Sequence, residues 1–241
     1  MPAYPANQIQ YDLLHNRHGQ PPLPHETYSD LASLPRLLTL PESAPHRDVD
    51  KIVLTTNHLT LHIKTAILAP PTIYGTGRGP LNTTSQQLPS LTRFILTRQF
   101  APRVGPTGLT EWDNIHITDV SSLFLCLVNA ALNPIQGHDE DIFGLKAYYF
   151  CENGRAHVWS DVAVEIAHES VRQGYLKEVV TKTVGIEEVP DKSWGTNSKS
   201  VAERARRYLD WSPQGRSLEE EIPGIVETEA KKLGLKRVGE E

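Results

Sequence analysis

From residue 62 onward, strand-like and helix-like segments alternate along the chain, and this alternation limits the possible fold more than any other feature of the sequence. Residues 62–69 (HIKTAILA) first alternate and then run apolar, which is typical of a buried strand. Further strands are expected at 101–105, 114–118, 146–151 and 178–184, and helices at 88–99, 119–131 and 162–173. Ser160 is the expected N-cap of the last of these helices. The order predicts an α/β fold.

The two ends of the chain differ in their local signals: the C-terminal part contains capping patterns, and the N-terminal part is rich in proline. Ser200-x-x-Glu203 and Ser217-x-x-Glu220 have the spacing of capping boxes, so both predict helix starts. Eight of the 18 prolines precede residue 46, and this density predicts irregular chain with at most short helical turns. We therefore expect an irregular segment at 1–45 and one domain at 46–241.

Charge and composition limit the classes of partner that the chain is expected to bind. The formal net charge is -5 and no block of Lys and Arg occurs, which argues against nucleic-acid binding and favours a small-molecule substrate. The two cysteines, Cys126 and Cys151, are too sparse for a disulfide framework and favour the cytoplasm. No uncharged apolar run approaches the roughly 20 residues that span a bilayer, so no membrane association is expected.

The strand at 62–69 ends at Pro70-Pro71 and leads into a loop over residues 72–80 that contains three glycines. A strand that ends in such a loop is a common place for a ligand. The only glycine cluster is Gly75-Thr-Gly77-Arg-Gly79, which runs into Pro80 rather than into a helix. It is therefore a weak signal for phosphate binding.

Three segments carry a family resemblance: KTAILAPPTIYGTGRGP, EWDNIHITDVSSLFLCLVNAAL and the closing SVAERARRYLDWSP. Together they resemble the extended short-chain dehydrogenase/reductases of the NAD-dependent epimerase/dehydratase group, and are most similar to fungal-type NAD(P)-binding members. The resemblance implies a partial Rossmann-like parallel sheet, the C-terminal half of that fold, with a smaller, mostly helical substrate-binding region. Its cofactor would be NAD or NADP.

The resemblance also implies the positions of the site residues. The strand-end loop lies beside the nicotinamide in this family, so the expected cofactor contacts are Pro70, Pro71, Thr72, Ile73 and Tyr74. The expected substrate contacts are Asn82, Ser85, Gln86 and His116. The residues themselves leave alternatives open: Tyr74 as a core residue, 82–87 as a surface loop, and His116 as a structural histidine.

Two departures from the family pattern concern catalysis. Family members extend further at their N-terminal side, where a Gly-x-x-Gly-x-x-Gly turn holds the pyrophosphate, and this chain has no such turn. No tyrosine has a lysine four positions on. Lys51 takes the place of the family's lysine and Arg47 that of its catalytic tyrosine, although 46–51 also reads as a charged helix start. An arginine does not release its proton near neutral pH, so this substitution disfavours ordinary alcohol oxidation.

The histidines give no metal-site prediction. His15 and His18, and likewise His58 and His62, have ligand-like spacing, but no cysteine or acidic partner accompanies them.

Two hypotheses remain. The first is an NAD(P)-linked oxidoreductase or epimerase-like protein that acts on a small carbonyl or hydroxyl substrate and is impaired as an isolated chain. The second is a non-catalytic remnant that serves as a binding or scaffold protein. An incomplete sheet would have an exposed edge, which predicts a homo-oligomer.

Overall fold

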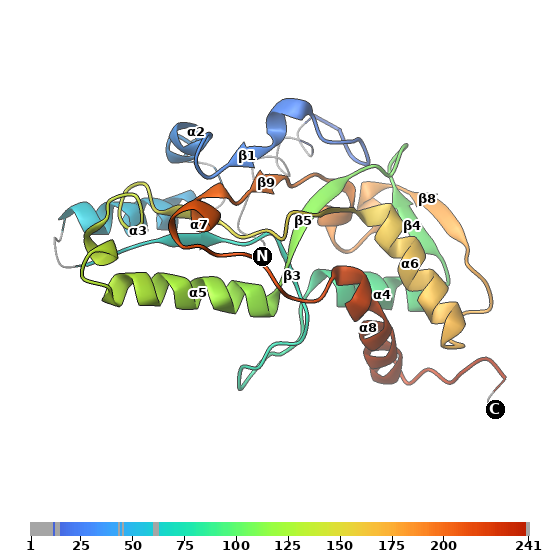
Figure 1. Ribbon diagram of the computed structural model, residues 1–241. Helices are drawn as coiled ribbons and strands as arrows, with labels where there is room; N and C mark the ends of the chain where they lie inside the picture. Colours follow the sequence, from blue (N-terminus) through green and yellow to red (C-terminus); the bar gives the residue numbers. More distant parts are fainter. Residues whose placement is uncertain (1–11, 13–14, 43, 45, 60–62, 240–241) are drawn as a thin grey trace.

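The structure, a computed structural model, describes residues 12, 15–42, 44, 46–59 and 63–239. Within them the chain forms two groups of elements at opposite ends of the molecule (Figure 1). Each group has its own hydrophobic core. We call the two groups the sheet lobe and the helical lobe.

The sheet lobe is built on two short parallel strand pairs. Strand β2 (Ile67–Ala69) pairs with β6 (Tyr148–Phe150), and β1 (Tyr28–Ser29) pairs with β9 (Ser200–Val201). Its helices are α2 (Leu34–Leu38), α3 (Arg47–Leu59), α5 (Ile117–Leu132) and α7 (Glu203–Tyr208). The core of this lobe contains Leu123 and Leu127 of α5, packed with the aromatic residues of β6.

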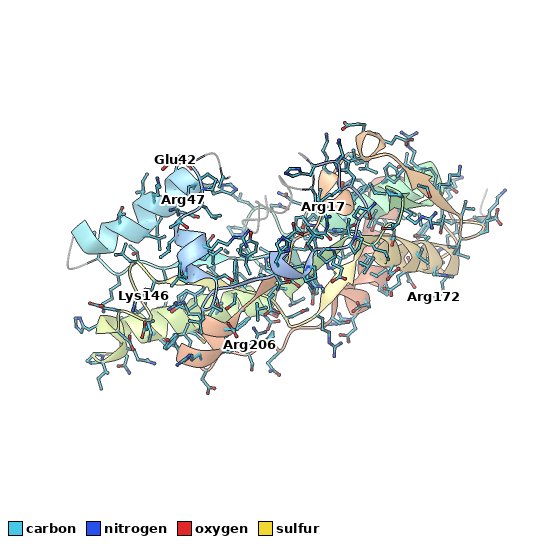
Figure 2. The ribbon with its side chains drawn as sticks, turned by 90° about the horizontal axis from the view of Figure 1, so that it is seen from above. Arg17, Glu42, Arg47, Lys146, Arg172 and Arg206 are labelled. Carbon is cyan, nitrogen blue, oxygen red and sulfur yellow. The ribbon has the colours of Figure 1, made fainter. Side chains whose placement is uncertain are left out.

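The helical lobe has one parallel strand pair, β4 (Ala101–Val104) with β8 (Thr181–Val184). Three helices pack on one another around it: α4 (Gln87–Arg98), α6 (Trp159–Arg172) and α8 (Leu218–Lys232). Leu88, Ile166 and Val226 are fully buried, one from each helix. Seen from above, Arg47 of the sheet lobe and Arg172 of the helical lobe lie at opposite ends of the molecule (Figure 2).

A three-stranded sheet joins the lobes. Strand β5 (Glu111–His116) pairs in parallel with β3 (Thr72–Tyr74) and antiparallel with β7 (Ala156–Val158). Trp112 of β5 belongs to the core of the helical lobe, whereas Ile115 belongs to that of the sheet lobe. Four short 3-10 turns complete the described elements: η1 (Pro24–Glu26), η2 (Gln136–His138), η3 (Ile186–Glu188) and η4 (Lys192–Gly195).

This arrangement confirms the α/β fold with a parallel sheet that is only partly built. Strand β2 pairs with β6 alone among the described strands, so its other edge has no strand partner there. The predicted capping box of Ser217 and Glu220 is also confirmed: the Ser217 hydroxyl accepts from the Glu220 N–H, and the Glu220 carboxylate accepts from the Ser217 N–H.

Several local predictions are wrong. Of the strand expected at 62–69, only 67–69 is a strand; 63–66 is not, and His62 lies outside the described residues. The loop expected at 72–80 begins instead with β3, because the two prolines separate two extended segments rather than ending the sheet.

Neither Ser160 nor Ser200 is an N-cap. Helix α6 already begins at Trp159, and the Ser160 hydroxyl donates to the Gly108 carbonyl at 2.7 Å. Ser200 lies in β9, where its N–H and hydroxyl both donate to the buried Asp113 carboxylate. A buried charged acceptor stabilises this extended conformation more than a solvent-exposed cap would stabilise a helix.

The described part of the N-terminal segment runs alongside the chain that leads into β9. The N–H groups of Gly19, Tyr28 and Asp30 donate to the carbonyls of Gly195, Lys199 and Val201 at 3.0, 3.3 and 3.3 Å. The segment is therefore held along its length despite its prolines. In the described part of the chain, no helix is both long and apolar enough to cross a bilayer.

Candidate functional site

The candidate site is a pocket at the junction of the lobes, where β2 and β3 end. Its volume is about 250 Å³. One wall is apolar and comes from Pro70, Pro71 and Ile73, with Ile117 beside them. A polar wall comes from residues 82–87, whose side chains carry amide and hydroxyl groups. The pocket thus combines apolar side chains with neutral hydrogen-bonding groups.

The segment that follows β3 requires a glycine at its start. Gly75 has a φ of +87°, and a Cβ there would lie 2.3 Å from Nε2 of His116. Gly77 lies further along the same wall, and its N–H donates to the Thr83 carbonyl at 2.9 Å, which closes the loop back on itself. A second hollow of about 270 Å³ shares Gly75 and residues 83–85 and extends to Glu221 and Gly224 of α8.

The expected cofactor contacts divide according to strand alternation. Pro70, Pro71 and Ile73 line the pocket, whereas Thr72 and Tyr74 are buried in the protein. Tyr74 donates to the Arg216 carbonyl at 2.7 Å, and burial raises its pKa to about 12. Its hydroxyl is thus engaged in the protein, as expected of a core tyrosine.

The expected substrate contacts also divide. Asn82, Ser85 and Gln86 all belong to the polar wall of the pocket. His116 does not line it. This histidine is the N-cap of α5: its Nδ1 accepts from the Thr118 N–H at 3.2 Å, so the proton of the neutral ring resides on Nε2. That Nε2 lies 3.9 Å from a Glu221 carboxylate oxygen, and the ring meets Tyr74 edge-on.

The two expected catalytic residues lie in the first two turns of α3 and do not line the pocket. Arg47 is buried and donates to the Leu38 carbonyl. Lys51 is partly exposed and forms an ion pair with Glu42. Figure 2 shows Arg47 and Glu42 close together at the α3 end of the molecule.

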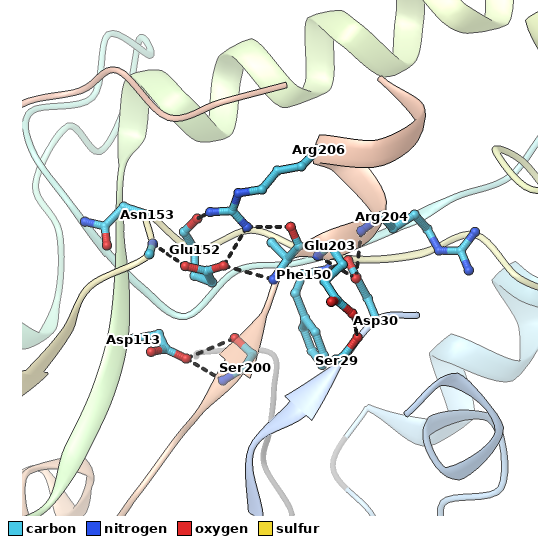
Figure 3. Close-up of polar contacts among 12 residues, drawn as sticks. Ser29, Asp30, Asp113, Phe150, Glu152, Asn153, Ser200, Glu203, Arg204 and Arg206 are labelled. Atoms are coloured by element: carbon cyan, nitrogen blue, oxygen red, sulfur yellow. Dashed lines mark hydrogen bonds and ion pairs between the residues drawn. The ribbon is translucent and has the colours of Figure 1, made fainter. Parts of the chain in front are cut away.

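Three buried carboxylates that the sequence analysis did not single out surround β9 (Figure 3). Asp30 accepts from the N–H groups of Phe150, Glu203 and Arg204 at 3.0, 2.8 and 2.9 Å. Asp113 accepts from Ser200, and its other oxygen lies 3.3 Å from Lys199 Nζ. Burial raises the pKa of each of these two carboxyl groups to about 6.

Glu152 is the third of these carboxylates. It accepts from the Ala202 N–H at 2.9 Å and from Arg206 Nη1 at 2.7 Å (Figure 3). All three bind backbone N–H groups of other segments and none lines the pocket, so they hold the chain in place. The signal in the sequence is an acidic residue inside or next to an apolar strand, as in EWDNIH and YYFCE.

A fourth carboxylate fixes the chain between α7 and α8. Asp119, in the first turn of α5, accepts from the N–H groups of Gln214 and Gly215 at 2.8 and 2.9 Å. Trp211 donates to Ser122 of the same helix at 2.9 Å. This part of the chain therefore crosses the N-terminal turns of α5 on its way between the lobes.

No group of three or more His, Cys, Asp or Glu side chains is placed to bind a metal ion among the residues that the structure describes. Both cysteines there are free thiols. His62 of the second histidine pair lies outside the described residues.

The comparisons with solved structures agree on the fold. The chain is similar to a UDP-glucose 4-epimerase from Thermotoga maritima solved with UDP-glucose, with a TM-score of 0.50 and 20% identity over 77% of this chain and 52% of that one. It is also similar to a dTDP-glucose 4,6-dehydratase from Bacillus anthracis solved with NAD, with a TM-score of 0.52 and 14% identity over 93% of this chain and 65% of that one. The fold is that of the NAD-dependent epimerase/dehydratase group of short-chain dehydrogenase/reductases.

No protein-family model matches the chain. The curated protein named Oxidase ucsJ, from Acremonium sp, is 32% identical over 241 residues, which cover 95% of this chain and 68% of that protein. The chain belongs to the same family as this oxidase. It spans 52% and 65% of the length of the two solved structures above.

Proposed function

We propose that this protein is an NAD(P)-linked oxidoreductase or epimerase-like protein that acts on a small carbonyl or hydroxyl compound in the pocket between the lobes. The observation that carries this proposal is that one pocket is lined by both apolar side chains and neutral hydrogen-bonding groups. Pro70, Pro71 and Ile73 would contact the face of a nicotinamide ring. Asn82, Ser85 and Gln86 would hydrogen-bond a substrate oxygen.

The pocket by itself is small for a dinucleotide, and a second hollow of about 270 Å³ adjoins it at Gly75 and residues 83–85. The pocket's own volume of about 250 Å³ lies below the range usual for ligand sites, about 300 to 1,000 Å³. The pyrophosphate of a dinucleotide is normally held by N–H groups at a helix N-terminus after a glycine-rich turn, which this sequence lacks. When bound, the nicotinamide would supply hydride transfer. The residues that line the pocket provide for its ring. Lys51, which the family resemblance implies as the contact to the ribose, would have to leave its ion pair with Glu42 to reach it.

The residues that line the pocket explain why the isolated chain should react slowly. They are Pro, Ile, Gly, Asn, Thr, Ser and Gln, and none of these side chains exchanges a proton near neutral pH. The Tyr74 hydroxyl donates its hydrogen bond to the Arg216 carbonyl, and Arg47 cannot act as an acid because its guanidinium stays protonated. The pocket can thus bind and orient a substrate, but none of the described side chains that line it acts as an acid or a base near neutral pH.

The same observation supports the alternative function, a non-catalytic protein that binds a small ligand or serves as a scaffold. Neutral amide and hydroxyl groups suffice to recognise a hydroxylated ligand without chemistry. The two functions differ in their need for the nicotinamide, because the alternative requires no contact between Ile73 and a cofactor ring.

Chemical-shift mapping separates the two functions. We expect NADH or NADPH to shift the backbone amide signals of Ile73, Gly75 and Gly77 and the side-chain amides of Asn82 and Gln86. Gln86→Ala should weaken these shifts, whereas Gln173→Ala should not, because Gln173 is the C-cap of α6, donates to the Pro223 carbonyl and does not line the pocket. Shifts confined to other parts of the chain, or none at millimolar cofactor, would contradict the cofactor role and favour the alternative.

We also propose that the chain self-associates and acts in the cytoplasm. The open edge of β2 is the surface that the sequence favours for self-association, because an unpaired strand edge can pair with another chain. That edge is three residues long. The cytoplasmic location rests on the sparse, unpaired cysteines.

A further inference from the structure

The second hollow adjoins the candidate pocket on the side of α8. It measures about 270 Å³ and shares Gly75 and residues 83–85 with the pocket. Because the two spaces have these lining residues in common, a ligand that contacts residues 83–85 from the pocket reaches the edge of the hollow. What the hollow can bind therefore bears on what the pocket can hold.

Gly224 keeps the hollow open. It lies in the interior of α8, where glycine is a poorer helix former than alanine. Its φ is not positive, and a Cβ at this position would meet no atom within 4 Å. Neither the backbone conformation nor the packing therefore requires a glycine here. The feature that remains is the space beside Gly224, which belongs to the hollow.

The hollow offers hydrogen-bond acceptors and no positive charge. Its described lining contains the hydroxyl groups of a serine and four threonines and the carboxylates of Glu221 and Glu229, but no Lys, Arg or His side chain. Glu229 is neutralised at both oxygens, by Arg93 at 2.5 Å and by Lys232 at 2.7 Å. Glu221 is therefore the carboxylate available to a ligand in the hollow.

Glu221 is held by one of its two carboxylate oxygens. Its Oε1 lies 3.2 Å from Arg216 Nη1 and 3.9 Å from Nε2 of His116, the nitrogen that carries the ring proton. Within the described part of the chain, Oε2 makes neither a hydrogen bond nor an ion pair. The side chain is only 15% exposed. A mostly buried carboxylate oxygen without a protein partner favours a ligand group that donates a hydrogen bond to it.

We propose that the hollow binds a protonated amino group of the substrate, with Glu221 as its acceptor. The inference rests on the proposed function, because the rest of the same substrate occupies the pocket. Arg216 lies within 4.0 Å of Glu220 as well as of Glu221, so a single guanidinium faces two carboxylates and leaves room for a second cation. An ammonium group donates up to three hydrogen bonds, and the hydroxyl oxygens of the hollow can accept those that Glu221 does not. The substrate is then an amino alcohol or an amino ketone.

Chemical-shift titration with three small probes at pH 7 tests the preference for an amine. Ethanolamine is the cationic probe, ethylene glycol its neutral match and glycolate its anionic match. We expect ethanolamine to shift the backbone amide signals of Gly224 and Thr228 and to bind about tenfold more tightly than ethylene glycol, because a hydrogen bond between charged groups is the stronger. Glycolate should not bind. Equal affinity for the glycol, tighter binding of glycolate, or no shift at Gly224 with any probe would overturn the proposal.

Two pairs of variants locate the site. Glu221→Gln should lower the affinity for ethanolamine about tenfold, whereas Glu219→Gln, on the same helix but outside the hollow, should leave it unchanged. Gly224→Leu fills the hollow and should abolish binding with a Tm no lower than that of the parent. Gly79→Leu, where a Cβ also meets no atom within 4 Å but which lies outside the hollow, should bind as the parent does. Parent-like binding by Glu221→Gln or by Gly224→Leu would contradict the proposal.

The same signals separate this inference from the proposed function. Ile73 and Gln86 line the pocket but not the hollow, whereas Gly224 and Thr228 line the hollow but not the pocket. NADH that fails to shift the signals of Ile73 and Gln86 would therefore count against the proposed function. Ethanolamine that fails to shift those of Gly224 and Thr228 would count against the amine site alone.

Discussion

The two lobes differ in what their helices show to solvent. Helices α4, α6 and α8 of the helical lobe expose no large apolar side chain, whereas α3 and α5 of the sheet lobe expose six in their described residues: Val49, Ile52, Phe124, Leu125, Val128 and Leu132. The cause lies in the packing. The three helices of the helical lobe cover one another, but the described strands of the sheet lobe form only two-stranded pairs. The helices of the helical lobe cover one another, whereas α3 and α5 of the sheet lobe each keep apolar side chains exposed.

The two lobes also differ in what their buried carboxylates bind. In the helical lobe, the buried Glu229 of α8 is paired with both Arg93 of α4 and Lys232, so the inner face of the helix is neutralised within the lobe. In the sheet lobe, the buried Asp30 carboxylate instead accepts hydrogen bonds from the backbone N–H groups of Phe150 and Glu203, which belong to two different segments. Both lobes are therefore stabilised by a packed hydrophobic core, and in the sheet lobe a buried carboxylate also caps backbone N–H groups.

The largest expected effect comes from emptying the core of the helical lobe. Ile166→Ala removes a fully buried side chain of α6 and should lower the free energy of unfolding by about 2 to 5 kcal/mol. Leu125→Ala, the matched change on the exposed face of α5, should change it by about 0.5 kcal/mol or less when measured on the monomer. Urea unfolding measures both. Equal losses would show that the buried face of α6 and the exposed face of α5 do not differ in packing as described.

A somewhat smaller loss is expected from Asp30→Ala, which leaves the N–H groups of Phe150, Glu203 and Arg204 without their acceptor. A buried, unsatisfied donor costs about 1 to 3 kcal/mol, and water can replace part of the loss. We expect about 3 kcal/mol by urea unfolding. Asp48→Ala, on the exposed side of α3, serves as the control with a loss below about 1 kcal/mol. A loss as small in Asp30→Ala would refute its capping role.

The pH dependence of stability sharpens the same point. Burial raises the pKa of Asp113 from 3.8 to about 6, so the folded chain holds this proton more tightly than the unfolded chain does. As the pH rises from about 4 to 6, this group makes the folded state less stable, and above about 6 its contribution stays constant.

Asp113→Asn removes this titration and keeps an oxygen acceptor for Ser200. The parent should therefore lose stability relative to Asp113→Asn by at most about 1.4 kcal/mol per pH unit across that window. Denaturation series at several pH values measure the difference. A difference that grows in the opposite direction would mean that Lys199 determines the pKa rather than burial.

Much of the helical lobe could be predicted from the sequence, because its signals are local. The apolar spacing at 88–99 and the capping box at Ser217 each determine an element within a few residues, and α4 and α8 are found there. The polar wall at Asn82, Ser85 and Gln86 was likewise readable, since such residues directly follow a strand and a glycine-containing loop.

The rest depends on contacts between residues far apart in the chain. Asp30 caps α7 across more than 170 residues, and no local pattern announces such a pair. The division at residue 45 stays a prediction. For Tyr74, strand alternation would have given the answer: Ile73 faces the pocket, so its neighbours Thr72 and Tyr74 face the protein interior.

The smallest expected effect is also the central one, the affinity of the pocket for NAD(P). Without a pyrophosphate-binding turn, the contacts that remain are the apolar wall and hydrogen bonds to the neutral groups of residues 82–87, each of which contributes about 0.5 to 1.5 kcal/mol. Micromolar binding requires about 8 kcal/mol. Calorimetry with NADH and NADPH measures the affinity directly. We expect a Kd in the high micromolar to millimolar range, weakened further by Gln86→Ala and unchanged by Lys146→Ala, whose lysine pairs with Asp141 and does not line the pocket. Micromolar affinity for the chain, or a Gln86→Ala variant that binds as well as the parent, would contradict the cofactor assignment.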